Sequence, residues 1–406
     1  MNTGKRNIFI LILLAFFGAI GISLIRPILP IFARRMGATG FAVGGLTSGF
    51  MLARAIMAYV CGKYSDRIGQ RKVFLPIGFF AYIVSCVFLF FSRSYADVLI
   101  ISICQGAFSG MIWPMAQVVT IESSMQAFKT RALSFYFASG NSGMTIGNAL
   151  LGGAIFFIMT LFGTGENDAF RIIFILSGAI YVICFFISFF ISEVKTEKTI
   201  KQKPRKQKAV KDHSAFISLI VLGFLIGIIP GLVRSIMVLY LNEQFLVSTK
   251  NIAFILMTLS LAGFFSMLIF SYFSDKKGTL KVLIVVCFMT GFAALIIPMI
   301  NNVWAVIVFL VIVGTGARSF TPISRSSMSE FGGGQLGQNI GLINTVSNLG
   351  SVVGPLAGGL LYDYFPKPFL FVNLNVSIFS FVGISILFSL VVMIRIYMKS
   401  KDHLSR

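Results

Sequence analysis

Apolar stretches long enough to cross a bilayer follow one another along almost the whole chain. Of its 406 residues, 57% are hydrophobic and only 12% are charged, whereas soluble domains carry about 25% charged residues. Because lipid cannot hydrogen-bond a bare backbone, spanning segments must be helices or a closed barrel. Long unbroken apolar runs favour helices over the alternating strands of a barrel.

Twelve helical spans fit this pattern, and the first apolar run, from Ile8 to Phe32, is too long for a cleavable signal peptide. The spans run at about 8–33, 41–62, 73–92, 97–122, 132–162, 170–192, 215–241, 251–272, 281–300, 303–329, 338–364 and 369–397. With the N-terminus inside, most of the 34 Lys and Arg residues lie on the inner side. Those outside are Arg34, Arg35, Arg93, Arg171, Lys250 and Lys367. This bias predicts a multi-pass protein of the cell membrane with both termini cytoplasmic.

A Lys-rich stretch at 193–214 separates the sixth span from the seventh. It predicts two six-helix halves, 1–192 and 215–406, joined by a basic cytoplasmic linker. The net charge of +21 does not indicate a nucleic-acid partner, because the cations flank spans and no soluble domain presents them. The expected partners are membrane lipid and a small-molecule solute, and we expect a monomer without cofactor or metal.

The two halves are related in sequence. The segment from Gly62 to Lys72 returns 209 residues later as Ser271 to Lys281. Pairs with a similar offset are Arg26 and Arg234, Pro114 and Pro322, Glu122 and Glu330, and Gly147 and Gly354. Several pairs in one register indicate an internal duplication. Membrane folds made of two similar halves commonly bind a solute where the repeats meet.

These features resemble the major facilitator superfamily across nearly the whole chain. Its G-x-x-x-D-R-x-G-R-R/K motif between spans 2 and 3 is matched, with Gln70 in place of the first basic residue, by Gly62, Asp66, Arg67, Gly69, Arg71 and Lys72. The second copy keeps Asp275, Gly278 and Lys281. The resemblance implies an all-α integral membrane protein of twelve transmembrane helices in two pseudo-symmetric halves. It also implies that the protein is a secondary transporter working by alternating access.

The motif residues are gating candidates. Span 11 carries Gly350, Gly354, Pro355, Gly358 and Gly359, and span 5 carries the weaker Gly143, Gly147 and Asn148. Glycines four residues apart let neighbouring helix backbones approach, and the resemblance implies that these glycines, Asp66 and Asp275 act in the gate. For Arg67, Arg71 and Lys72 the alternative is simple anchoring at the membrane surface. Exporters of the family have a proline where Asn148 stands, so the direction of transport stays open.

Four arginines inside the spans are the candidates for solute binding: Arg26, Arg54, Arg234 and Arg318. Arg54 precedes Asp66 by 12 residues, which puts it about 18 Å from that end of the helix. Carboxylates are scarce at these depths, and a guanidinium group suits a carboxylate or phosphate. The sequence therefore favours an anionic organic solute. The alternative is structural: these arginines reach the surface or bond backbone carbonyls freed by helix breaks near Pro27, Pro30 and Pro230.

The sequence gives few signals for the ion gradient that drives transport. The family's drug and proton antiporters carry an Arg three residues before Gln105-Gly106, where this chain has Ser102. Glu122 is the remaining candidate for coupling to a proton or other ion gradient. Its structural alternative is an ion pair with Arg131 at the inner gate.

Two other functions compete with the transport of a small anion. Abundant Phe, with 44 residues, and the polar Tyr136, Asn141, Asn344 and Asn348 would also suit a proton-driven efflux pump for drug-like amphiphiles. A membrane enzyme or sensor is the third reading. Both histidines, His213 and His403, lie outside the spans and no catalytic motif is evident, so we expect no enzyme.

Overall fold

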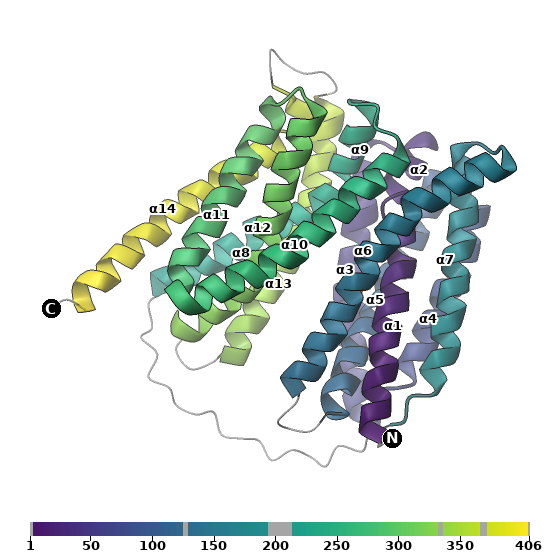
Figure 1. Cartoon of the computed structure of the whole chain (residues 1–406), viewed down its shortest axis with the longest axis horizontal. Coiled ribbons are helices and arrows are strands. Elements are labelled where there is room, and N and C mark those ends of the chain that lie inside the picture. The colour runs from purple at the N-terminus through teal and green to yellow at the C-terminus, as the bar shows by residue number, and fades with distance from the viewer. Residues whose placement is uncertain (1–2, 125–128, 194–212, 332–335, 366–371, 405–406) are drawn as a thin grey trace. The chain divides into compact units, whose positions relative to one another are not determined.

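The computed structural model describes residues 3–124, 129–193, 213–331, 336–365 and 372–404, which are almost entirely helical. The chain divides into two compact units. The first comprises Met1–Ile200 with Leu241–Met257, and the second comprises Lys201–Tyr240 with Thr258–Arg406. Each unit is a bundle of long helices (Figure 1). This confirms the predicted all-α fold class. Most of the predicted linker, residues 194–212, lies outside the described part of the chain.

The first unit pairs its helices in a fixed pattern. Its helices are α1 (Thr3–Ile25), α2 (Leu29–Arg35), α3 (Gly40–Ile68), α4 (Phe74–Phe91), α5 (Tyr95–Glu122), α6 (Lys129–Phe162) and α7 (Glu166–Phe189). Helix α1 packs along α6 and α7, α3 packs along α5, and α4 packs between α5 and α7 (Figure 1).

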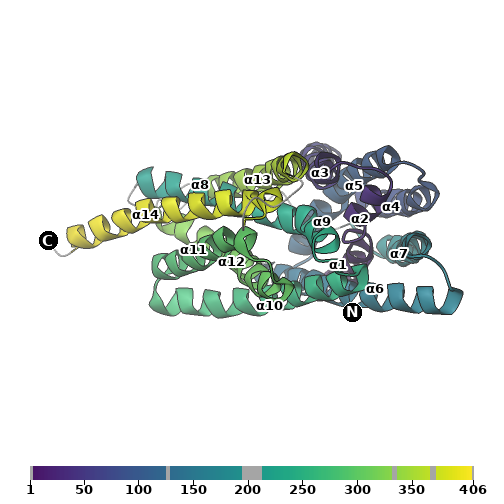
Figure 2. The same cartoon turned by 90° about the horizontal axis from the view of Figure 1, so that it is seen from above.

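The second unit repeats much of this pattern. Its helices are α8 (His213–Arg234), α9 (Ile236–Glu243), α10 (Thr249–Lys277), α11 (Thr279–Ile296), α12 (Val303–Phe331), α13 (Leu336–Tyr364) and α14 (Ile378–Leu404). Helix α8 packs along α13 as α1 does along α6, and α11 packs between α12 and α14 as α4 does between α5 and α7 (Figure 2). The end of α9 and the start of α10 cluster with the first unit. The duplication seen in the sequence is thus a duplication of helix packing.

Eleven helical segments of the described chain are long and apolar enough to cross a membrane, with α1 and α2 counted together. The remaining predicted span, span 11, is α13, which has 29 residues. It is less apolar because it carries Asn344, Ser347, Asn348 and Ser351. With α13 included, the helices match the twelve predicted spans.

Spans 1 and 7 are both interrupted, as the prolines predicted, but the second break is displaced. Helix α1 ends at Ile25 and α2 begins at Leu29, with Pro27 in the break. Helix α8 continues past Pro230 and ends at Arg234. The Ser235 amide bonds the carbonyl of Leu232 at 3.3 Å, and its hydroxyl donates to the carbonyl of Gly231 at 2.8 Å. The side chain thus satisfies the Gly231 carbonyl where the backbone bond is lost, at a break that lies about one turn after Pro230.

The repeated motif places a glycine at each tight connection between helices. Gly69 follows α3 with φ of 66° and donates its amide to the carbonyl of Ser65. Gly278 separates α10 from α11 with φ of 92°. Side chains are disfavoured at positive φ. These two motif glycines therefore have a structural reason to be glycine, whatever their part in gating.

Candidate functional site

Arg26 lies in the break between α1 and α2, where its side chain enters the interior of the first unit. Its guanidinium carbon is 3.4 Å from the centre of the Phe50 ring on α3. Its Nη1 donates to the hydroxyl of Ser102 on α5 at 3.3 Å, and that hydroxyl donates to the carbonyl of Leu46 at 3.0 Å. The aromatic ring and the serine therefore fix the plane of the guanidinium group.

The first unit holds several buried polar atoms that make no well-formed hydrogen bond among the described residues, although the side chain of Tyr82 contacts both Arg26 and Ser109. They include Nε and Nη2 of Arg26, Nε2 of Gln105 and the hydroxyls of Tyr82, Ser109 and Tyr136. Arg54 interacts electrostatically with Tyr82 and Tyr136, and Arg26 interacts with Tyr82 and Arg54. We call Arg26, Arg54, Tyr82, Gln105, Ser109 and Tyr136 the Arg26 cluster.

The Arg26 cluster has no acidic member in the described part of the chain. Four described carboxylates of the first unit have other partners near the helix ends. Glu122 pairs with Arg71, Glu166 with Arg35 and Glu243 with Arg34, while Asp97 caps the start of its own helix. The two guanidinium groups interact with each other and with nearby phenols, and Arg26 also contacts Ser102 and Phe50.

Arg318 in the second unit has a different environment. It donates to the carbonyl of Ser260 at 3.3 Å and to the Ser260 hydroxyl at 3.4 Å, both on α10. A methyl group added at Gly263 would overlap its side chain, so that glycine makes room for the arginine. These contacts fit the structural alternative, and solute contact by Arg318 stays a prediction. Arg234 is half-buried at the C-terminal end of α8, and its role stays a prediction too.

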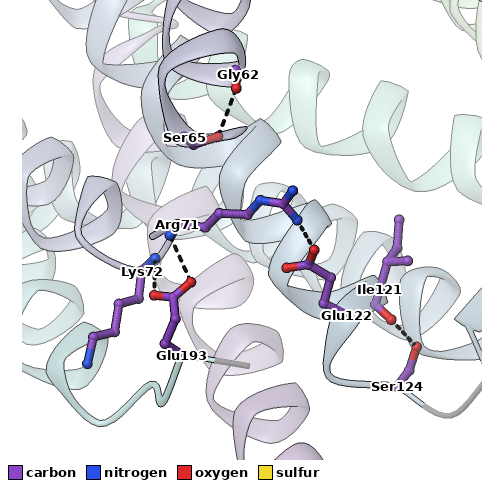
Figure 3. A network of polar contacts seen from close by, with 8 residues as sticks. All are labelled: Gly62, Ser65, Arg71, Lys72, Ile121, Glu122, Ser124 and Glu193. Atoms are coloured by element: carbon purple, nitrogen blue, oxygen red, sulfur yellow. Dashed lines mark hydrogen bonds and ion pairs between the residues drawn. The ribbon is translucent and has the colours of Figure 1, made fainter. Parts of the chain in front are cut away.

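A second polar network lies at the end of the first unit where α4 begins (Figure 3). The guanidinium group of Arg71 forms an ion pair with Glu122 at the end of α5. The backbone amides of Arg71 and Lys72 donate to the Glu193 carboxylate at 2.8 and 3.1 Å. Glu193, which follows α7, thus holds the loop before α4, where free amides favour an anion. The motif arginine Arg71 is thus an ion-pair partner of Glu122, where the sequence suggested Arg131.

The contacts of the other residues of the repeated motif are not seen in the structure or are few. Arg67, Lys72 and Asp275 are exposed, and a side chain at Gly62 would meet open space. The side chains of Asp66 and Glu330 lie outside the described part, so their predicted contacts stay predictions.

The chain was compared with known proteins. The model of the Major Facilitator Superfamily matches residues 11–233 and again residues 219–405. The chain belongs to the Major Facilitator Superfamily. It is 23% identical over 404 residues to the quinolone resistance protein NorA of Staphylococcus aureus, covering 96% of each chain. It is 24% identical over 381 residues to multidrug resistance protein 2 of Bacillus subtilis, covering 90% of this chain and 92% of that one.

The fold agrees with solved transporters. A bacterial homologue of the human lysosomal transporter Spinster, in an inward-facing and unoccupied conformation, superposes with a TM-score of 0.72 at 14% identity. The match covers 97% of this chain and 95% of that one. The resemblance inferred from the motifs is therefore confirmed, and this member of the superfamily is a membrane transporter.

The glycine motif of this transporter packs helices within one unit. Added methyl groups at Gly350, Gly354 and Gly358 would overlap α8, at Phe224, Ile228 and Leu232 respectively. Gly143 and Gly147 of α6 meet α1 in the same way. Pro355 lies against Gly231, and Gly359 is buried. The small residues thus let α13 lie directly against α8. A role of these residues in gating stays a prediction.

Several residues of the Arg26 cluster, and two that contact Arg26, were missed at the sequence level. Ser102, Gln105 and Ser109 on α5, with Phe50 and Tyr82, were not among the predicted site residues. A signal did exist, because the three α5 residues are spaced by three and four positions and so share one helix face. Glu193 was missed because it lies in the basic segment that was predicted to be a linker.

The ion pair between Glu122 and Arg71 predicts how Glu122→Gln will behave. The two side chains are 14% and 21% exposed, and breaking a partly buried pair costs about 1 to 2 kcal/mol. We expect the rate of transport in proteoliposomes to fall, with its dependence on an imposed pH gradient unchanged. Exchanging the charges, with Arg71→Glu and Glu122→Arg together, should recover part of the rate. Loss of pH-driven accumulation with exchange intact would instead make Glu122 the proton carrier.

Proposed function

We propose that this protein is a secondary exporter of amphiphilic organic compounds and that it prefers compounds carrying a negative group. Membership of the superfamily supports alternating-access transport, and the names of two relatives, for quinolone and multidrug resistance, support export of drug-like compounds. We further propose that a proton or other ion gradient drives the transport, and that the protein works as a monomer in the plasma membrane. The excess of basic residues in the inner segments supports cytoplasmic termini.

The proposed preference for anions rests on the surroundings of Arg26 and Arg54, which contain no carboxylate in the described part of the chain. A charged side chain inside the bilayer costs several kcal/mol unless a partner compensates it. In the described part of the first unit these two arginines interact with phenols and serines rather than with carboxylates. A solute that supplies the missing negative charge would therefore be stabilised more than a neutral solute of the same shape.

A second candidate is export of neutral or cationic amphiphiles. It is favoured by the aromatic side chains of the first unit, since Phe50, Tyr82, Tyr136 and Tyr181 are all buried. Arg26 already stacks on Phe50, so the cluster presents aromatic as well as charged groups. Under this alternative the arginines have a structural role and the charge of the compound does not affect its export.

The test compares a quinolone carboxylic acid with its methyl ester in cells that express the protein and in cells that do not. We expect the acid to accumulate several-fold less in the expressing cells. The ester, which has the same rings but no charge on that group, should be affected much less. Export of the ester alone would favour the second candidate. Equal accumulation of both compounds in both cell types would refute export of this class.

A further inference from the structure

We infer that the Arg26 cluster of the first unit is a binding site for a carboxylate carried on an aromatic ring. This inference rests on the proposed function and assigns the recognition of the negative group to residues of one unit. It departs from the expectation that paired arginines of both halves share the solute.

The free edge of Arg26 provides the first argument. Its Nη1 donates to Ser102, while its Nε and Nη2 are buried and make no well-formed hydrogen bond among the described residues, although the Tyr82 hydroxyl contacts the guanidinium group. Nε and Nη2 form one edge of the planar guanidinium group. Their two N–H bonds run nearly parallel, the arrangement that binds both oxygens of a carboxylate.

The neighbouring groups provide the second argument. Nε2 of Gln105 is a buried amide donor that has no partner among the described residues, and the hydroxyls of Tyr82, Ser109 and Tyr136 can also donate, although those of Tyr82 and Ser109 also contact each other. A carboxylate only accepts hydrogen bonds and has about four lone-pair sites. Buried donors that lack acceptors are unfavourable, so an acceptor-only ligand satisfies several of them together. A cationic or donor-rich ligand would leave them unsatisfied.

The surroundings favour a carboxylate on an aromatic scaffold over a hydrophilic anion. Phe50 covers one face of the Arg26 guanidinium group, and the rings of Tyr82 and Tyr181 lie 4.7 Å apart between centres. Tyr82, Tyr136 and Tyr181 are all nearly inaccessible. Such an aromatic environment gains from burying an apolar ring. A phosphate or sulfate offers the same charge-assisted bonds but no apolar surface.

The experiment measures benzoate binding to the purified full-length protein in detergent, as the rise of the unfolding temperature with ligand concentration. We expect a saturable rise with benzoate, little rise with benzamide, and a weaker rise with inorganic phosphate. Arg26→Gln should weaken benzoate binding at least about tenfold, and Arg26→Lys by a similar factor because lysine keeps the charge but loses the paired N–H groups. Gln105→Leu should weaken binding about three- to tenfold.

Two matched variants serve as controls. Tyr59→Phe alters a tyrosine on α3 that is 73% exposed, and Arg93→Gln removes an exposed arginine that precedes α5. Both should bind benzoate like the unmodified protein. Benzoate binding that persists in both Arg26 variants would overturn the inference, as would equal binding of benzamide. If phosphate binds more tightly than benzoate, the site is one for a hydrophilic anion and the aromatic carboxylate is wrong.

The failure of this inference is distinguishable from failure of the proposed function. Binding of benzoate that depends on Arg26, without export of the quinolone acid by cells, would leave the site standing and refute the exporter. Export of the acid that is unchanged in Arg26→Gln cells, with benzoate binding also unchanged, would refute the site and leave the exporter standing.

Discussion

Replacing Gly350 by leucine is expected to prevent the second unit from folding. A single added methyl group at this position already overlaps the carbonyl oxygen of Phe224 and comes within 3.0 Å of the Ile228 amide nitrogen. Both obstacles are backbone atoms of α8, which cannot move aside as a flexible side chain can. Overpacking of a well-packed core usually costs about 1 to 3 kcal/mol, and a leucine side chain against fixed backbone should exceed that range.

The yield of monodisperse protein in detergent and its unfolding temperature measure this effect. Gly341→Leu is the matched control, because Gly341 lies in the same helix α13 and an added methyl group there meets nothing within 4 Å. Leucine has a higher helix propensity than glycine, so the control should be neutral or slightly more stable. Equal yields and unfolding temperatures for the two variants would contradict the close contact of α13 with α8.

Arg54→Gln is expected to have opposite effects on transport and on stability. Among the described residues Arg54 interacts electrostatically with Tyr82 and Tyr136, and no carboxylate compensates its charge. Removing an unpaired charge from the interior should leave the unfolding temperature unchanged or raise it. If the charge attracts the solute, transport of an aromatic carboxylate should fall at least about tenfold, the effect expected when a charge-assisted contact is lost.

The measurement is paired with Arg35→Gln. Arg35 forms an ion pair with Glu166 and donates to Asn167, so its loss should lower the unfolding temperature slightly while transport stays near that of the unmodified protein. Arg54→Gln protein that unfolds at a lower temperature and still transports the acid at the full rate would assign Arg54 a structural role.

The helices, their order and the duplication were predictable from the sequence. Bilayer thickness sets the length of a spanning helix, and apolar runs of that length are visible along the chain. The motif glycines at the tight connections were equally visible, because positive φ selects glycine. The break in span 7 was expected near Pro230 but lies after Arg234. The hydrogen bond of the Ser235 hydroxyl at that break cannot be read from the apolar pattern of the sequence. The pairing of Glu122 with Arg71 was not predicted, because Arg71 is distant in sequence and adjacent only through packing.

The sequence by itself determined that the chain is a membrane transporter of paired six-helix halves with uncompensated arginines in its spans. The tertiary structure alone decided which residues surround each arginine. In a membrane helix both the lipid-facing and the buried faces are apolar, so composition gives the depth of a residue but not the direction it faces. Packing of α3, α4 and α5 around the break after α1 brings Phe50, Tyr82 and Ser102 to Arg26, while α10 satisfies Arg318 with the backbone and side chain of Ser260.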